Sequence, residues 1–275
     1  MNRLSLLREA WTILKRNPIL WSIPLLTLTI DTLANWVVLL LPPETTIVRV
    51  LLAFVLAAFT TGVLITSVNA IADGQPVTLF GGLRAGLRRL LPLFLLNLLL
   101  SLPVWLVIVG LSGSITAIFT SGLGQPGALQ ATNVLSVIVS LGLASVVLAV
   151  NAATNLIGIG AERDLLQDDL TVIASVKSGG QLLLRQSRDY ISIAIMLVGV
   201  VLGVGLAFAF ILGPLLSGLA TGFSETPEAV PPAALFSPIN VLFILISLIV
   251  NSLYTTFAST VWTLAYREWR GAPET

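Results

Sequence analysis

The chain has 275 residues, of which 56% are hydrophobic and only 10% are charged, and its mean hydropathy is +0.99. Soluble globular domains carry roughly 25% charged residues, so this composition excludes a core of ordinary proportions with a water-facing surface. The formal net charge of +1 gives no reason to expect an acidic partner. The absence of cysteine and histidine excludes disulfides, thiol nucleophiles and the commonest general base. We therefore expect a membrane protein that is not an enzyme and that holds no metal or cofactor.

Six windows are long and apolar enough to cross about 30 Å of hydrocarbon as helices of about 20 residues. In chain order they cover approximately residues 18–41, 47–71, 90–118, 134–159, 190–216 and 239–266. Helices are expected because an open strand cannot satisfy its backbone hydrogen bonds in lipid, and the alternating polarity of a barrel is absent. The run that begins at Pro18 is longer than the apolar segment of a signal peptide, so we expect it to be retained as the first span.

The basic residues lie almost entirely on one side of these spans. Of the 14 lysines and arginines, Arg49 alone lies toward the other side, near the start of the second span. The others precede the first span, follow the sixth, or lie between the second and third or the fourth and fifth. Because the loops that remain in the cytoplasm carry the excess of Lys and Arg, both termini are predicted to be cytoplasmic.

A basic, amphipathic segment precedes each odd-numbered span. Ahead of the third span, Leu79, Leu83 and Leu87 recur at helical spacing and leave the arginines on another face. Such helices lie in the membrane interface, with the apolar face in the acyl boundary and the cations toward anionic headgroups. No aromatic platform accompanies the cations, so we expect membrane lipids as partners and no nucleic acid. The cations expected to contact headgroups are Arg8, Lys15, Arg16, Arg84, Arg88, Arg89, Arg185 and Arg188.

The charge and hydropathy pattern divides one membrane domain, residues 1–275, into three similar units. Each unit reads as interfacial helix, span, external loop and span, over approximately residues 2–76, 77–169 and 170–270. Units of two spans share one orientation, so an axis along the membrane normal would relate them. The predicted fold class is therefore an all-α integral membrane protein with six transmembrane helices in three helix-pair repeats. Each pair is preceded by a cytoplasmic interfacial amphipathic helix.

Polar residues recur at helical spacing inside the predicted spans. Asp31 is the only acidic residue deep within one, and a carboxylate there is costly unless it is neutralised, paired or hydrated. Thr27, Asp31 and Asn35 follow one another every four residues and share a helix face. Two interpretations remain open: hydrogen bonds between helices, or a site that binds a proton or ligand. The candidate residues for such a site are Thr27, Asp31, Asn35, Asn97, Asn151, Asn155 and Asn251.

Two further patterns favour a structural role. Gly199 and Gly203 form a GxxxG pattern, which we expect to bring helices close together. The segment AERDLLQDDL, residues 161–170, gathers carboxylates that suit a divalent cation, but the spacing matches no calcium loop. We expect solvation and capping instead, with Asp168 or Asp169 capping the helix that follows.

The order REAWTILKRNPILW, ADGQPVTLFGGLRAGLRRLLPLF and ERDLLQDDLTVIASVKSGGQLLLRQSRDY resembles a group of bacterial six-span membrane proteins. The group includes the membrane domain associated with glycerophosphodiester phosphodiesterases and many uncharacterised relatives. The resemblance implies a multi-pass protein of the bacterial cytoplasmic membrane. It does not imply phosphodiesterase activity, because that activity belongs to a separate soluble domain for which this chain has no room.

These observations favour a non-enzymatic polytopic membrane protein that handles a lipid or small amphiphile, or that supports a membrane or cytoplasmic protein partner. A first alternative is a small transporter in which Asp31 binds a proton or cation. A second alternative is a structural or regulatory membrane scaffold that makes its contacts through the interfacial helices.

Overall fold

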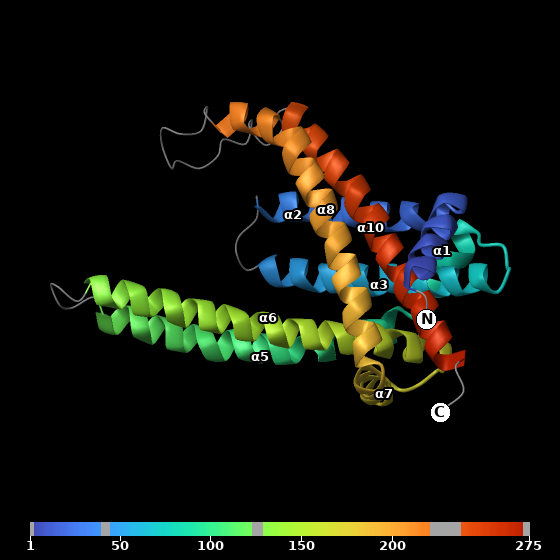
Figure 1. Cartoon of the computed structure of the whole chain (residues 1–275), viewed down its shortest axis with the longest axis horizontal. Coiled ribbons are helices and arrows are strands. Elements are labelled where there is room, and N and C mark those ends of the chain that lie inside the picture. Colours follow the sequence, from blue (N-terminus) through green and yellow to red (C-terminus); the bar gives the residue numbers. More distant parts are fainter. Residues whose placement is uncertain (1–2, 40–44, 123–128, 221–237, 272–275) are drawn as a thin grey trace. The chain divides into compact units, whose positions relative to one another are not determined.

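A computed structural model describes residues 3–39, 45–122, 129–220 and 238–271. These residues form nine α-helices and no strand, which confirms that the described part of the chain is all-helical (Figure 1). The helices are α1 (Arg3–Arg16), α2 (Ile19–Leu39), α3 (Thr46–Ala72), α4 (Leu79–Arg88), α5 (Leu90–Gly122), α6 (Leu129–Gln167), α7 (Val172–Arg185), α8 (Ser187–Ala220) and α10 (Pro238–Gly271).

Five of these helices contain a segment long and apolar enough to cross a membrane, so the chain is a helical, multi-pass membrane protein. The segments are Ile47–Ala72 in α3, Leu90–Val109 in α5, Ala144–Gln167 in α6, Ser187–Phe208 in α8 and Val241–Gly271 in α10. The predicted first span corresponds to α2, a helix of 21 residues that is not one of the five. Its apolar residues are interrupted by polar ones, among them Asp31 and Asn35.

The helices belong to two compact units. The first comprises residues 1–86 and 186–275 and contains α1, α2, α3, most of α4, α8 and α10. The second comprises residues 87–185 and contains α5, α6 and α7, in which α6 packs against both α5 and α7.

The C-terminal half of α10 forms the centre of the first unit, where it packs against α1, α2 and α3. Six consecutive residues, 261–266, are buried, so neighbouring side chains enclose the helix on every side. The start of α8 joins this centre through Tyr190, which stacks on Trp269 at 4.6 Å between ring centroids and lies 5.3 Å from Trp262. Aromatic pairs at these separations add to the energy of simple burial.

Polar contacts at one end of the helices hold the same elements together. Arg267 of α10 donates to the Asp73 carboxylate, at 2.6 Å, just after the end of α3. This hydrogen bond holds the pKa of Asp73 below its usual value. Arg3 of α1 donates to Asp189 of α8 at 2.8 Å. These pairs are partly exposed to solvent, so each stabilises the fold only weakly.

The amphipathic helices α4 and α7 contact the spans through small residues. Gly82 and Gly86 are the buried positions of α4, and a Cβ at Gly86 would collide with Val63 of α3. The leucines of the predicted apolar stripe face away, since Leu79 and Leu87 are exposed. The stripe of α4 is therefore largely exposed, while the face beside it is used for packing.

In the second unit, α7 packs against α6 in the same way. Ser175 and Gly179 are its buried positions, and a Cβ at Gly179 would lie 2.6 Å from the Ile157 carbonyl oxygen and 2.7 Å from the Ala161 nitrogen. These are backbone atoms of α6, which cannot move aside as a flexible side chain could. Gly179 therefore permits a close approach of two helices that no larger residue allows.

The prediction that Asp168 or Asp169 caps α7 is wrong, because Thr171 caps it. The Thr171 hydroxyl oxygen accepts from the backbone N–H of Ala174 at 3.4 Å, as expected of an N-cap residue. Asp169 instead adopts a φ of 52° and forms an ion pair with Arg89. Thr78 begins α4 like Thr171, with its hydroxyl oxygen accepting from the N–H of Gly81 at 3.2 Å.

The prediction that Gly199 and Gly203 bring helices together is also wrong within the part of the chain that the structure describes. A Cβ at either glycine would meet nothing within 4 Å. GxxxG permits close approach but does not require it, and α8 is exposed over this segment. Close approach depends instead on the glycines of α4 and α7.

Gly179→Ala is expected to destabilise the second unit by about 1–3 kcal/mol, the usual cost of overpacking. The neighbouring Gly180→Ala is the matched control, because a Cβ there meets nothing within 4 Å. It should leave the free energy of unfolding unchanged or raise it by about 0.5–1 kcal/mol through helix propensity. SDS-induced unfolding of the purified protein, followed by circular dichroism, measures both variants. Equal effects of the two substitutions would contradict the proposed close contact.

Candidate functional site

The predicted polar stripe of α2 divides into two parts with different partners. Thr27 is buried, and its hydroxyl oxygen accepts from the Thr60 hydroxyl of α3 at 2.8 Å. The Asn35 side-chain amide donates to an Asp31 carboxylate oxygen at 3.3 Å. The side-chain oxygen of Asn35 is buried with no hydrogen-bond partner among the described residues, whereas Asp31 is half-buried. Thr27 therefore joins two helices, and Asp31 and Asn35 contact each other.

A row of hydroxyls on α10 faces α2 and was missed by the sequence analysis. Ser252 and Thr256 are buried; the Ser252 hydroxyl donates to the Trp21 carbonyl oxygen, and that of Thr256 reaches the Leu20 carbonyl oxygen at 3.4 Å. Their spacing of four residues was visible in the sequence. Asn251, the predicted residue of this helix, lies one position earlier and is exposed.

The remaining predicted asparagines belong to the second unit, whereas Asp31 belongs to the first. The Asn155 amide donates to the backbone and side-chain oxygens of Asn151 at 2.7 and 3.0 Å, and both residues are exposed. Asn97 is half-buried on α5. The described contacts of Asn151 and Asn155 are thus local to one turn of α6.

Most cations predicted to contact headgroups are exposed. The exposed ones are Arg8, Lys15, Arg16, Arg84, Arg88, Arg185 and Arg188, and Arg89 is half-buried in its ion pair with Asp169. Arg163, in contrast, is buried at the end of α6, where it donates to the Ile159 carbonyl oxygen at 2.6 Å and lies 3.8 Å from Glu162. Asp164 is also buried, so the expectation that the carboxylates of residues 161–170 are solvated is wrong for this residue.

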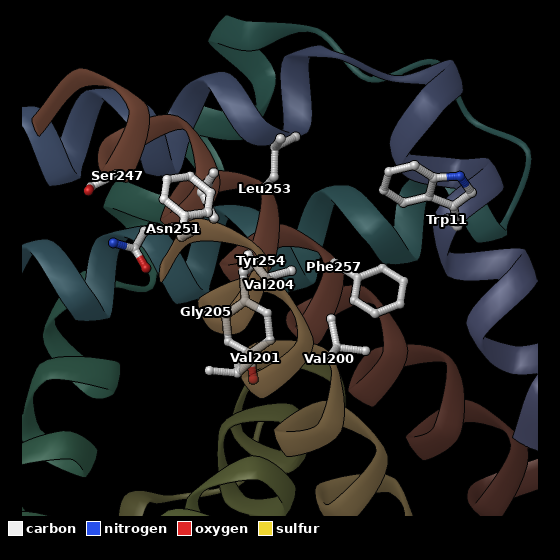
Figure 2. Close-up of a pocket in the computed structure, with 12 residues that line it drawn as sticks. Trp11, Val200, Val201, Val204, Gly205, Ser247, Asn251, Leu253, Tyr254 and Phe257 are labelled. Carbon is white, nitrogen blue, oxygen red and sulfur yellow. The ribbon is translucent and has the colours of Figure 1, made fainter. Parts of the chain in front are cut away.

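A pocket of about 540 Å³ lies between α8 and α10 in the first unit (Figure 2). Its walls are mostly valine and aromatic side chains, with few polar groups. The lining residues are Val200, Val201, Val204, Gly205 and Phe208 from α8, Ser247, Val250, Asn251, Leu253, Tyr254 and Phe257 from α10, and Trp11 from α1.

The pocket extends along α10 from Ser247 to Phe257, and its two ends differ. At 1.5 Å per residue this segment is about 15 Å long, or half the hydrocarbon thickness of a bilayer. Ser247 and Asn251 lie at one end and Trp11 at the other, as Figure 2 shows. There the Trp11 ring meets Phe257 edge to face, with centroids 6.3 Å apart at 77°. Lys15, one turn further along α1, has its Nζ 5.9 Å from the centre of the Trp11 ring.

Of the residues predicted to bind a ligand, the pocket includes Asn251 alone. Tyr254, Phe257 and the valines of α8 were missed, because a valine-lined wall looks like any lipid-facing helix in sequence. Trp11 lies in the basic, amphipathic segment that precedes the first predicted span. Its place in the pocket depends on α1 packing against α10, a contact between residues more than 230 positions apart.

Comparison with protein-family models, with curated protein sequences and with solved structures finds no match for this chain.

Proposed function

We propose that this chain is a non-enzymatic, six-span protein of the bacterial cytoplasmic membrane that binds the hydrocarbon part of a lipid or small amphiphile between α8 and α10. The observation that carries this proposal is the pocket of about 540 Å³. Ligand sites are typically concave and mostly apolar, with a few polar groups that fix orientation. Ser247, Asn251 and Tyr254 supply such groups here.

The dimensions of the pocket suit an acyl chain. A wall of about 15 Å matches one leaflet of the hydrocarbon core. The pocket also begins at Trp11, and tryptophan favours the headgroup level of a bilayer. A chain that enters beside Trp11 would therefore remain in the apolar region as far as Ser247.

The six-span topology requires α2 to cross the membrane together with the five more apolar helices. Its packing against α3 and α10 supports this, because both neighbours carry spanning segments. A polar group inside a bilayer has no water to bond and needs a partner within the protein. The buried hydroxyls of Thr27 and Thr60 fulfil this requirement by hydrogen bonding to each other. Six spans leave both termini on the cytoplasmic side, in agreement with the distribution of Lys and Arg.

The equivalence of α4 and α7 supports the repeat. Thr78 and Thr171 each cap a helix. Four residues later comes a buried small residue, Gly82 or Ser175, and eight residues later a buried glycine, Gly86 or Gly179. Each helix packs by these positions on the span that precedes it, and α1 packs on the last span, α10.

Gly205→Phe is expected to displace the bound lipid by placing a ring in the pocket. Gly205 lines the pocket and a Cβ there meets nothing within 4 Å, so the fold should tolerate the change. If accommodating the ring together with a ligand costs about 1–3 kcal/mol, the fraction of pockets that hold a lipid falls by roughly tenfold. Native mass spectrometry of the protein released from nanodiscs measures the retained lipid.

The control for this experiment is Gly203→Phe. Gly203 is also free of neighbours within 4 Å but does not line the pocket. It should retain lipid like the wild type. If both phenylalanine variants retain wild-type amounts of lipid, the pocket is not the binding site and the proposal is wrong.

A second candidate function, proton- or cation-coupled transport, is favoured by the surroundings of Asp31. Its carboxylate is half-buried beside Asn35, whose side-chain oxygen is buried without a hydrogen-bond partner among the described residues. Protonation of Asp31, or a small cation bound beside it, would offset the cost of a carboxylate inside a membrane, as expected of a functional carboxylate there.

Asp31→Asn separates the two candidates, because Asp31 does not line the pocket. Lipid retention in this variant should equal that of the wild type. Proton uptake into proteoliposomes under an imposed pH gradient should fall to the level of protein-free vesicles if Asp31 carries protons. Thr27→Val, which removes a structural hydroxyl from the same helix face, should preserve any flux. Equal flux in wild type and Asp31→Asn would reject the transport hypothesis.

A further inference from the structure

We propose that the α8–α10 pocket selects an anionic phospholipid, whose phosphate is held by Lys15 while its acyl chain lies along the pocket from Trp11 inward. The inference rests on the proposed lipid-binding function and names the class of lipid. It is carried by the position of a cation at one end of the apolar pocket.

Trp11 links the cation to the pocket. Its ring lines the pocket and contacts Phe257 on one side, while Lys15 lies 5.9 Å from its centre. Trp11 is 49% exposed, so the pocket is not closed at this end. A ligand that passes Trp11 therefore comes within reach of the ammonium group as soon as it leaves the apolar walls.

Lys15 is available to a ligand because no carboxylate of the described residues forms an ion pair with it. Other cations of the first unit are already paired, since Arg3 binds Asp189 and Arg267 binds Asp73. Arg8, three residues before Trp11, is exposed like Lys15 and lies on the same side of α1. Two cations beside one tryptophan favour a phosphate over a neutral polar group.

The chemistry of Lys15 suits a headgroup contact. Lys15 is in the last turn of a short helix outside the spanning segments. A lysine can cover apolar surface with its stem while its charge remains in polar surroundings. The pocket extends about 15 Å from Phe257 toward Ser247, a length that accommodates much of one acyl chain.

The experiment compares four forms of the full chain: wild type, Lys15→Gln, Lys15→Arg and Lys177→Gln. Lys177 is the matched control, an exposed lysine on the amphipathic helix α7 that is not part of the pocket. Each form is reconstituted in nanodiscs of equal phosphatidylglycerol and phosphatidylethanolamine and then extracted in mild detergent. Native mass spectrometry counts the retained lipids of each class.

The wild type, Lys15→Arg and Lys177→Gln are expected to retain phosphatidylglycerol over phosphatidylethanolamine by roughly fivefold, the contribution of one basic residue near an anionic headgroup. Lys15→Gln should retain a similar total of lipid with a clearly smaller preference, because Arg8 is its one remaining cation beside Trp11. An undiminished preference in Lys15→Gln, or an equal fall in Lys177→Gln, would overturn the inference.

The Gly205→Phe variant distinguishes failure of this inference from failure of the proposed function. If it loses lipid while Lys15→Gln keeps the headgroup preference, the pocket binds lipid but Lys15 does not select it. If Gly205→Phe retains wild-type lipid, the pocket is not the site, and the proposed function and this inference are both wrong.

Discussion

The first unit depends on the enclosure of residues 261–266 of α10, because apolar burial alone gives little force between helices in lipid. Close packing must hold the helices together instead, and residues 261–266 of α10 are packed against neighbours on every side. Tyr190, at the start of α8, packs its ring against Trp262 and Trp269 of α10. Beyond Leu197, α8 is mostly exposed. The pocket therefore lies where α8 extends past the segment that is enclosed.

The same constraint explains which polar residues are buried within this unit. A threonine or serine in a helix can donate to a carbonyl of its own preceding turn, as Thr256 does to Ser252 at 2.9 Å. Such a side chain enters a helix interface without an unsatisfied donor, and its oxygen can still accept from a neighbour, as Thr27 does from Thr60. A carboxylate has no donor, and its charge is costly to desolvate. Asp31 accordingly remains half-buried, while the hydroxyls occupy the helix contacts.

The helices and their amphipathic nature could be predicted from sequence, because length, apolarity and the order of charges are local properties. The faces through which the helices contact one another could not be predicted from sequence. Protein interior and lipid are both apolar, so helical periodicity does not show whether an apolar face packs against another helix or against lipid. Leu87 and Gly86 illustrate this: the leucine stripe was evident, yet the glycine beside it makes the contact with α3. Asn251 was identified as a candidate, but the pocket that it lines depends on side chains from α1, α8 and α10.

Specificity for a lipid has to arise where its headgroup meets the protein, because walls of valine distinguish acyl chains only by about 0.8 kcal/mol for each CH₂ group buried. Among the described amphipathic helices, α4 and α7 turn small residues toward the spans, whereas α1 packs through Leu6, Ala10 and Leu14. This larger contact face sets Trp11 beside Phe257 and so brings a cation to the pocket. The feature that distinguishes α1 from α4 and α7 is therefore the one that gives the apolar pocket a charged end.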